Sequence, residues 1–398
     1  MPDQTLELAA TDAGGWTGPP RAARPSAVVA MAGAGQLAQM CQQAAISLGV
    51  ELRLLAGSPD ESAVAAGARA LIGDNSTRNL RALAEGAAVL TFDHEGFDPE
   101  MLAELKIEGL HMAPAPEAVL FAQDKLVARE NLSRLGYPLP PFAVAETIED
   151  FDSFAAEHGW PLVAKTPRGG YDGGGVFVLD DRAAAVDLLA GGPGTLILEP
   201  LLRIHREFAV QAARSTSGEI ALYPAVETIQ VDAICHEILV PGSLPEEVRF
   251  LASEITRRLV EEIGATGMVA VEFFLTDDGV LINELALRPH NSGHWTIEGS
   301  VTSQFEQHLR AVLGWPLGST QITAPAVATA NILGPEDGVD PTARAADLVA
   351  DPDVHLHLYG KAYRPGRKLG HLTVLAGDLE TAREKTRRAL ARLTEEGE

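Results

Sequence analysis

A short apolar strand, a glycine turn, a helix and a second strand follow one another near the start of the chain. The first strand spans 27–31, the turn contains Gly33 and Gly35, the helical pattern reaches Leu48, and the second strand spans 51–55. A unit of this kind places its helix across the sheet and its two strands parallel. Further strand patterns follow at 70–72 and 87–92. Residues 27 to about 120 are therefore predicted to form a parallel α/β unit.

The pattern of predicted helices and strands changes twice beyond this unit. The middle part is predicted to hold helices at 124–135 and 246–263 and strands at 160–165, 175–179, 195–199, 207–213, 220–226, 269–275 and 280–283. After 315–318, short strands at 355–359 and 371–375 precede a helix from Leu379. We expect an α/β and α+β chain with a leader at 1–26, an α/β domain at 27–122, a second domain at 123–316 with a subdomain at about 123–200, and a small β-rich domain at 317–398.

Charge and cysteine content exclude several classes of protein. The chain carries 55 Asp and Glu against 31 Lys and Arg, a net charge of −24, so we expect no nucleic-acid partner. Cys41 and Cys235 are the only cysteines, which excludes a disulfide framework and a cysteine-based zinc ribbon. Residues 1–26 are polar and rich in Gly and Pro and are predicted to be disordered. With no apolar run of about 18 residues, no membrane partner is expected, and the predicted location is the cytoplasm.

A glycine-rich loop joins two predicted strands in the middle of the chain. It reads Lys165-Thr166-Pro167-Arg168-Gly169-Gly170-Tyr171-Asp172-Gly173-Gly174-Gly175. Its lysine precedes the glycines, so it is not a Walker loop. A flexible lid over phosphates explains the mixture of glycines and cations, whereas a purely structural hairpin is the alternative.

Two acidic side chains are predicted to lie side by side on neighbouring strands. A tight turn at 276–279 separates the strand of Glu272 from that of Glu284, with Asn283 adjoining. Adjacent carboxylates favour a cation, and one or two carboxylates together with nucleotide phosphates suit Mg²⁺. Solvated strand residues are the alternative.

Three polar segments complete the candidate site. The loop Arg288-Pro289-His290-Asn291-Ser292-Gly293-His294-Trp295-Thr296 has too few hydrophobic residues for a core, and Pro289 and Gly293 argue against a zinc-binding helix. The segment 359–368 holds four cations in an acidic chain, which indicates an anion site or a solvated basic turn. The turn at Gly33 and Gly35 lacks a third dinucleotide-type glycine, so we expect either a structural turn or anion binding, with Gln36 as the contact.

Several short segments share a resemblance that extends over most of the chain. They are 33–37, 91–95, 123–125, 169–173, 283–286, 288–296, 303–311, 359–361 and 364–368. Together they resemble the ATP-grasp superfamily and, within it, the 5-(carboxyamino)imidazole ribonucleotide synthetases. The resemblance implies an ATP-grasp fold with an N-terminal pre-ATP-grasp domain and a small C-terminal domain.

The resemblance also implies an activity, cofactors and site residues. The activity is the ATP- and bicarbonate-dependent carboxylation of 5-aminoimidazole ribonucleotide through carboxyphosphate, in purine biosynthesis, with ATP and Mg²⁺ as cofactors and a homodimer as the assembly. The implied ATP-binding residues are Lys125, Lys165, Glu199, Leu202, Glu207, Asn283 and Glu284, and the metal ligands are Glu272 and Glu284. The implied substrate-binding residues are Gln36, Leu37, Glu95, Arg288, Asn291, Ser292, Arg367 and Lys368, and the implied catalytic residues are Tyr171, Asp172, His290 and Lys361.

The glycine-rich loop departs from the family pattern at one position. A basic residue that would face bicarbonate is usual where this chain has Gly174. Either Arg168 fills the gap, or the chemistry is impaired or directed elsewhere. Smaller departures are Gly96 and the segment 231–233. The alternatives are an ATP-grasp enzyme that carboxylates or ligates another small amine, and a nucleotide-binding protein with little turnover.

Overall fold

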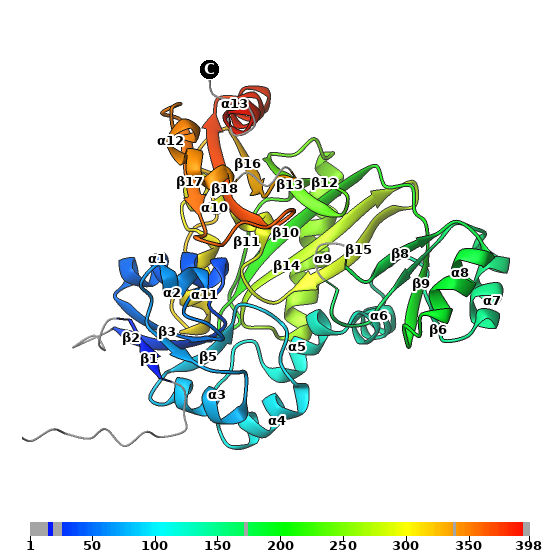
Figure 1. Ribbon diagram of the computed structural model, residues 1–398, viewed down its shortest axis with the longest axis horizontal. Coiled ribbons are helices and arrows are strands. Elements are labelled where there is room, and N and C mark those ends of the chain that lie inside the picture. The colour runs from blue at the N-terminus through cyan, green and yellow to red at the C-terminus, as the bar shows by residue number, and fades with distance from the viewer. Residues whose placement is uncertain (1–14, 19–25, 171–173, 337–339, 393–398) are drawn as a thin grey trace, which may run out of the picture.

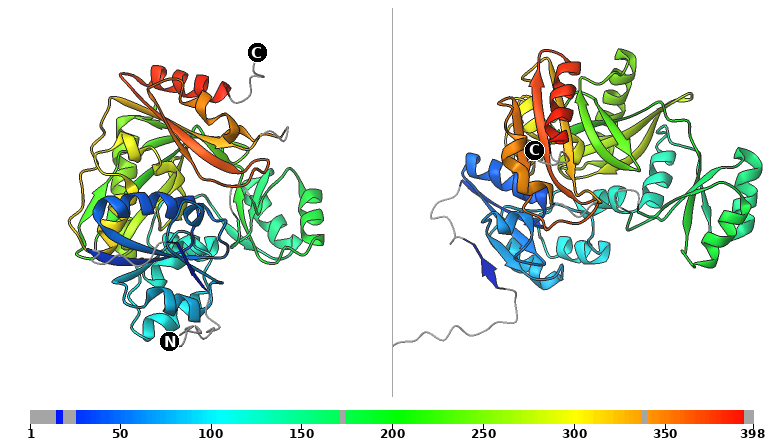
Figure 2. Two further views of the ribbon diagram at one scale, coloured as in Figure 1. Left: turned by 60° about the vertical axis from the view of Figure 1, so that its left-hand side comes forward. Right: turned by 45° about the horizontal axis from the view of Figure 1, so that its top comes forward.

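The computed structural model describes residues 15–18, 26–170, 174–336 and 340–392. In Figure 1 the N-terminal sheet lies at the lower left, a small sheet lies at the right, and a large sheet runs between them up to the C-terminal elements. Figure 2 shows the small sheet with its helices as a lobe projecting from the body. Over the described ranges, no helix is long and apolar enough to cross a membrane.

The N-terminal sheet confirms the predicted parallel α/β unit. Its parallel strands, in the order β4-β3-β2-β5, are β2 (Ala27–Ala32), β3 (Val50–Ala56), β4 (Ala70–Ile72) and β5 (Val89–Phe92). Its helices are α1 (Gln36–Leu48), α2 (Ser62–Ala65), α3 (Thr77–Ala84) and α4 (Pro99–Ile107). β3 is buried along its whole length because both faces of the sheet are covered. The carboxyl ends of these strands therefore form one edge to which polar loops are attached.

The leader was expected to be disordered, and this is wrong for two of its residues. Trp16 and Thr17 form β1 (Trp16–Thr17), which pairs antiparallel with Leu71 and Ala70 of the edge strand β4. The guanidinium of Arg69 lies 4.8 Å from the centre of the Trp16 ring, so a cation-π contact adds to the strand pairing. An edge strand offers unpaired backbone groups, and this short segment satisfies part of them.

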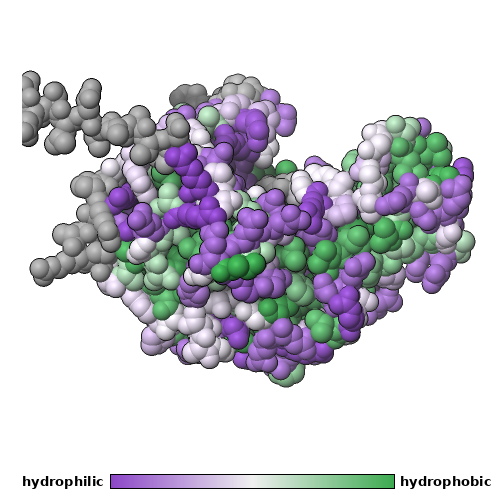
Figure 3. Space-filling view, turned by 90° about the horizontal axis from the view of Figure 1, so that it is seen from below, coloured by the Kyte–Doolittle hydropathy of each residue, from purple (hydrophilic) through white to green (hydrophobic). Residues whose placement is uncertain are grey.

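The small sheet forms the projecting lobe. Its antiparallel strands, in the order β6-β9-β7-β8, are β6 (Ala143–Ala145), β7 (Leu162–Lys165), β8 (Val176–Leu179) and β9 (Leu196–Pro200). Helices α7 (Ile148–His158) and α8 (Arg182–Ala190) pack on it, and α5 (Pro116–Gln123) and α6 (Lys125–Arg134) connect it to the N-terminal unit. In Figure 3 this lobe, on the right, shows hydrophobic side chains at its surface. Its exposed hydrophobic residues include Val144, Phe177 and Val178.

The large sheet spans the middle and the C-terminal parts of the chain. Its strand order is β15-β14-β10-β12-β13-β16-β18-β17, with β11 beside β10. The strands are β10 (Arg206–Arg214), β11 (Ile220–Leu222), β12 (Val226–Val231), β13 (Ile234–Val240), β14 (Gly267–Thr276), β15 (Gly279–Ala286), β16 (Ala326–Leu333), β17 (Val354–Leu358) and β18 (Lys368–Ala376). The helices are α9 (Glu246–Ile263), α10 (Thr296–Gly299), α11 (Gln304–Val312), α12 (Ala345–Leu348) and α13 (Leu379–Ala391), with 3-10 turns at Asn291–Gly293 and Pro341–Arg344.

The elements of the expected small β-rich C-terminal domain continue the sheet of the preceding domain, because β16 pairs with β13. One expected strand in this sheet is corrected. The strand expected at 220–226 is interrupted between β11 and β12, where Pro224 lacks a backbone N–H for the ladder.

Candidate functional site

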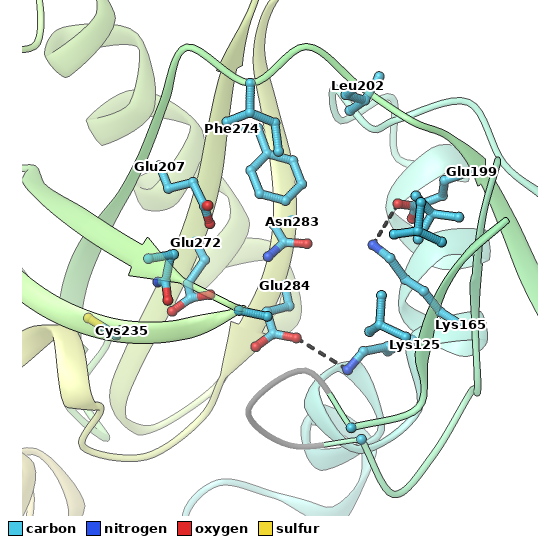
Figure 4. Close-up of a pocket in the computed structure, with 18 of the residues that line it drawn as sticks. Lys125, Lys165, Glu199, Leu202, Glu207, Cys235, Glu272, Phe274, Asn283 and Glu284 are labelled. Carbon is cyan, nitrogen blue, oxygen red and sulfur yellow. Dashed lines mark hydrogen bonds and ion pairs between the residues drawn. The ribbon is translucent and has the colours of Figure 1, made fainter. Parts of the chain in front are cut away.

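A cavity of about 340 Å³ lies between the small sheet and the large sheet. Figure 4 shows its two walls facing each other, with Lys165 and Glu199 on one side and Glu207, Glu272 and Asn283 on the other. We call it the first cavity. Predicted site residues that line it are Lys125, Lys165, Glu199, Leu202, Glu207, Glu272, Asn283, Glu284, His290, Asn291, Ser292 and Lys368. The structure therefore brings together predicted residues from both sheets.

The small-sheet wall is organised around one buried carboxylate. Lys165 ends β7 and Glu199 lies on the adjacent strand β9, so their side chains meet with Nζ 2.6 Å from Oε2. Arg129 of α6 binds the same carboxylate, with Nη2 2.7 Å from Oε1. Burial favours a raised pKa for Glu199, but the two cations outweigh it and hold that pKa below its usual value. Burial lowers the pKa of Lys165, and Glu199 opposes this. The carboxylate of Glu199 thus orients Lys165 in the cavity.

The start of α6 brings a second lysine into the first cavity. Asp124 caps this helix by accepting from the backbone N–H groups of Leu126 and Val127, which fixes Lys125 at the first turn. Lys125 Nζ reaches across to Glu284 Oε2 at 3.2 Å. Arg168 instead binds Asp124, with Nε 2.7 Å from Oδ2. Arg168 lies outside the described lining of the first cavity, so the structure does not bring it to the position that Gly174 leaves without a cation.

The large-sheet wall carries the predicted carboxylate pair. Glu272 and Glu284 are cross-strand neighbours of β14 and β15, as expected. Burial, followed by repulsion from Glu284 and Glu207, raises the pKa of Glu272 to about 8. Burial raises the pKa of Glu207 to about 7. A wall of carboxylates that disfavour one another is stabilised by a bound cation, and the oxygen donors of Glu272, Glu284 and Asn283 fit Mg²⁺.

The loop after β15 places an uncharged histidine beside Glu272. His290 Nε2 lies 3.5 Å from Glu272 Oε1, and Nδ1 lies 2.8 Å from Ser292 Oγ. Burial and the nearby cations Arg288 and Lys368 lower the pKa of His290 to about 3. Among the residues that the structure describes, no group of three or more His, Cys, Asp and Glu side chains is arranged to hold a metal by itself. The loop therefore places an uncharged imidazole at the carboxylate wall.

A second cavity, of about 510 Å³, lies at the carboxyl edge of the N-terminal sheet. Its lining includes the predicted residues Gln36, Leu37, Glu95, Arg288 and Lys361. Gln36 begins α1. Glu95 follows β5 and forms an ion pair with Arg288, whose Nε lies 2.9 Å from Glu95 Oε1. Because Arg288 and His290 are two residues apart, one loop contributes to both cavities.

Asp93 is a residue of the second cavity that received no role in the sequence analysis. Its carboxylate accepts from the backbone N–H of Gly35 at 2.9 Å, and burial raises its pKa. Gly33 has φ +112°, and a Cβ there would lie 1.5 Å from Asp93 Oδ1. Glycine is therefore required at 33, and the turn that was read as a possible anion site serves to seat this carboxylate.

The remaining predicted residues divide into two groups. Arg367 lies outside the described lining of both cavities, and its Nη1 donates to the carbonyl of Ala362. Tyr171 and Asp172 lie outside the described residues, so their catalytic roles stay predictions. The first cavity is also lined by Gln230, Cys235 and Phe274, which the sequence analysis did not select. Their alternation on β12, β13 and β14 resembles that of ordinary strand residues, so no sequence signal separated them from the core.

Comparisons with known proteins agree with this geometry. Residues 27–123 match the ribonucleotide synthetase preATP-grasp domain, residues 130–305 the ATP-grasp domain, and residues 328–385 the phosphoribosylaminoimidazole carboxylase C-terminal domain. The chain is 44% identical over 365 residues to the N5-carboxyaminoimidazole ribonucleotide synthase of Mycobacterium tuberculosis, covering 88% of this chain and 84% of that protein. It is 40% identical to that of Corynebacterium ammoniagenes, over 96% of each chain.

Solved structures give the same result. The N5-carboxyaminoimidazole ribonucleotide synthetase of Thermus thermophilus superposes with a TM-score of 0.84 at 36% identity, over 93% of this chain and 99% of that one. The Aspergillus clavatus N5-carboxyaminoimidazole synthase, solved with ADP and 5-aminoimidazole ribonucleotide, gives 0.83 at 29% identity over 93% and 99%. The predicted ATP-grasp fold is thereby confirmed, and the chain belongs to the N5-carboxyaminoimidazole ribonucleotide synthase family.

Proposed function

We propose that this chain carboxylates the exocyclic amine of 5-aminoimidazole ribonucleotide at the expense of ATP, with bicarbonate as the carbon source. The observation that carries the proposal is the pair of cavities joined by the loop after β15. Arg288 of that loop lines the second cavity and His290 lines the first. On this proposal, an intermediate made from ATP in the first cavity passes along this loop to an amine held in the second.

In the first cavity, the chain's own residues bind and orient the nucleotide. Lys125 and Lys165 approach from the small-sheet side and neutralise phosphate charge, while Leu202 supplies apolar surface for the base and Glu207 accepts from the ribose hydroxyls. Glu272 and Glu284, with Asn283, would hold Mg²⁺, which screens the phosphate oxygens during transfer. Phosphoryl transfer depends mainly on such positioning and charge neutralisation.

Bicarbonate attack on the γ-phosphate yields carboxyphosphate, which reacts readily with water. Lys368 lies in the first cavity and is buried, so its ammonium is suited to hold an anion there. Arg288 and Lys361 of the second cavity would orient the ribonucleotide by its anionic groups. The neutral imidazole of His290 does not compete with these cations for the anion. On this proposal, the two sheets limit water access to the labile intermediate when the ligands are bound between them.

The test is incorporation of labelled bicarbonate into an acid-labile carbamate, measured with ATP and Mg²⁺ in the presence and absence of 5-aminoimidazole ribonucleotide. Incorporation that requires the ribonucleotide supports the proposal. Phosphate release without incorporation would contradict it. A parallel assay of Gly174→Arg asks whether the missing loop cation limits the rate: a faster variant means that it does, and an equal or slower one means that the loop works without it.

A second candidate rests on that same position. Gly174 lines the first cavity, and Arg168 is held by Asp124 instead of entering it. This arrangement favours a family member that carboxylates or ligates another small amine. Phosphate release that responds to a different amine, and not to the aminoimidazole ribonucleotide, would support this candidate.

Assembly and location are further proposals. We propose a homodimer on the basis of the family resemblance, to be tested by light scattering of the purified protein. We also propose the cytoplasm as the location, because the buried thiols of Cys41 and Cys235 suit a reducing compartment. A monomeric mass, or secretion of the protein from its native cell, would contradict the respective proposal.

A further inference from the structure

Behind His290, a chain of buried hydrogen bonds runs into the middle of β10. Gln211 Nε2 lies 2.7 Å from Ser292 Oγ, which in turn lies 2.8 Å from His290 Nδ1. Gln211 is completely buried, and Ser292 is nearly so. Gln211 lies outside the described linings of both cavities, so it reaches the site only through Ser292.

The contacts favour one direction for each hydrogen bond in this chain. The backbone N–H of Ser292 donates to His290 Nδ1 at 3.3 Å, so this nitrogen accepts and carries no proton. The Ser292 hydroxyl beside the same nitrogen must then donate its only proton to it. That hydroxyl can only accept from Gln211, which turns its amide N–H toward the serine. The imidazole proton of His290 is left on Nε2, 3.5 Å from Glu272 Oε1.

We propose that Gln211 is a positioning residue that fixes, through Ser292, the tautomer of His290 with its proton on Nε2. The Nε2 proton of His290 then faces Glu272 Oε1 at 3.5 Å, and Oε2 is the oxygen that would be left for the ligand. The strand register supports this geometry, because Gln211 pairs with Ala270 and Glu272 pairs with Ala209 on the same two strands. Hydrogen bonds to the second ring nitrogen commonly set the tautomer and orientation of a functional histidine.

The catalytic meaning of this inference rests on the proposed function, since it concerns the carboxylate assigned to the phosphate end of the site. The tautomer itself does not depend on that assignment. The experiment therefore begins with a readout that needs neither substrate nor metal: the ¹⁵N NMR spectrum of the full chain labelled at its histidines, with the His290 signals identified from their loss in His290→Asn. A wild-type spectrum with the proton on Nδ1 would overturn the proposal at once.

Two variants then test the role of Gln211. In Gln211→Glu, a carboxylate accepts the Ser292 proton, so that only the backbone N–H of Ser292, at 3.3 Å, still donates to Nδ1, and we expect the Nδ1-protonated tautomer of His290 to become populated. In Gln211→Met, the donor is removed at similar volume, and we expect a mixture of tautomers. For each variant, kcat should fall about 10- to 100-fold, as for other residues that orient active-site groups, with the KM for the ribonucleotide within about threefold of wild type. A pure Nε2 tautomer in both variants, or an unchanged kcat, would overturn the proposal.

Gln307 supplies the matched control. It is a completely buried glutamine on α11 whose amide bonds to the backbone of Gly318, remote from His290 in the hydrogen-bond network. Gln307→Met should lower thermal stability as much as Gln211→Met but leave the tautomer and kcat unchanged. Failure of the proposed function would show differently, as a wild type with the Nε2 tautomer and no labelled carbamate.

Discussion

The two cavities differ in how their charged side chains are held in place. In the first, charged side chains already form ion pairs, Lys165 with Glu199 within the small sheet and Lys125 of α6 with Glu284 of the large sheet across the gap. The second lies at the edge of one parallel sheet, where the backbone N–H of Gly35 seats the buried carboxylate of Asp93. A ligand in the first cavity must exchange partners with an ion pair that spans the gap, whereas a ligand in the second meets a carboxylate held by the backbone, beside the ion pair of Arg288 with Glu95.

This difference indicates separate roles for the two cavities. The ion pair of Lys125 and Glu284 is partly exposed. A phosphate can replace Glu284 as the partner of Lys125, and a cation can replace Lys125 as the partner of Glu284. Such an exchange suits a nucleotide that arrives as ATP and leaves as ADP. The carboxylate of Asp93, which the backbone holds in the second cavity, suits a substrate that must be bound in one orientation. The predictions below test whether the cavities are separable in this sense.

The largest effect is expected for Glu272→Gln in the first cavity. The neutral amide is a poorer cation ligand, so turnover should fall on the order of 1000-fold, comparable to the loss of a main electrostatic group. Stability should not fall, because the change removes repulsion from Glu284 at a buried position. Phosphate release and thermal unfolding are the two measurements. Asp277→Asn, an exposed carboxylate in the turn between the same strands, should keep its turnover within about twofold; equal losses in both variants would contradict the assignment.

The two lysines of the segment 359–368 should separate the cavities kinetically. Lys361 lines the second cavity, so Lys361→Ala should raise the KM for the ribonucleotide about 10- to 100-fold, the worth of one charged hydrogen bond. Lys368 lines the first, so Lys368→Ala should instead lower kcat or raise the KM for bicarbonate or ATP. Steady-state kinetics with each substrate varied in turn decides this. If both variants change the same parameter, the cavities are not separable.

Acid should weaken the packing between the N-terminal sheet and the large sheet. His308 Nε2 contacts Thr91 of β5 at 2.9 Å, and the backbone N–H of Met268 on β14 donates to Nδ1. Burial lowers the pKa of His308 from 6.5 to about 4. The folded state therefore binds fewer protons than the unfolded state, so this contribution is complete above pH 6.5 and is lost as the pH falls toward 4, by about 2 kcal/mol at pH 5.

Urea unfolding of wild type and His308→Gln at pH 7.5 and pH 5 measures this contribution. The other buried histidines act in the same direction, so the difference between the two proteins isolates His308. The free energy of unfolding should fall less on acidification in the variant. Parallel losses in the two proteins would refute the role of His308.

The smallest effect is expected for Arg367→Ala. The side chain is partly exposed and bonds to the carbonyl of Ala362, outside the described lining of either cavity. We expect kcat and every KM to stay within about threefold of wild type. A loss as large as that of Lys361→Ala would mean that Arg367 does bind the ribonucleotide, as the family resemblance implied.

Sequence patterns predicted elements best where local chemistry marks both ends. The helix 246–263 was predicted with the bounds observed, because Pro245 precedes it and Gly264, with φ +62°, follows it. β16 was missed although it is apolar, since strand pairing between distant segments leaves no local mark. The same holds for the site. Glu272 and Glu284 were paired by a short turn, whereas Gln211 and Gln230 are polar residues inside strands whose importance depends on what lies across the sheet.

The continuity of the large sheet affects how this molecule unfolds. Its hydrogen-bonded ladder passes from β13 to β16 without a gap, so residues on either side of the expected domain boundary share one structural layer. We therefore expect a loss of stability at β18, which begins with Lys368, to extend to β14, which carries Glu272. A chain ending near residue 317 would also expose the edge of β13, which β16 covers here.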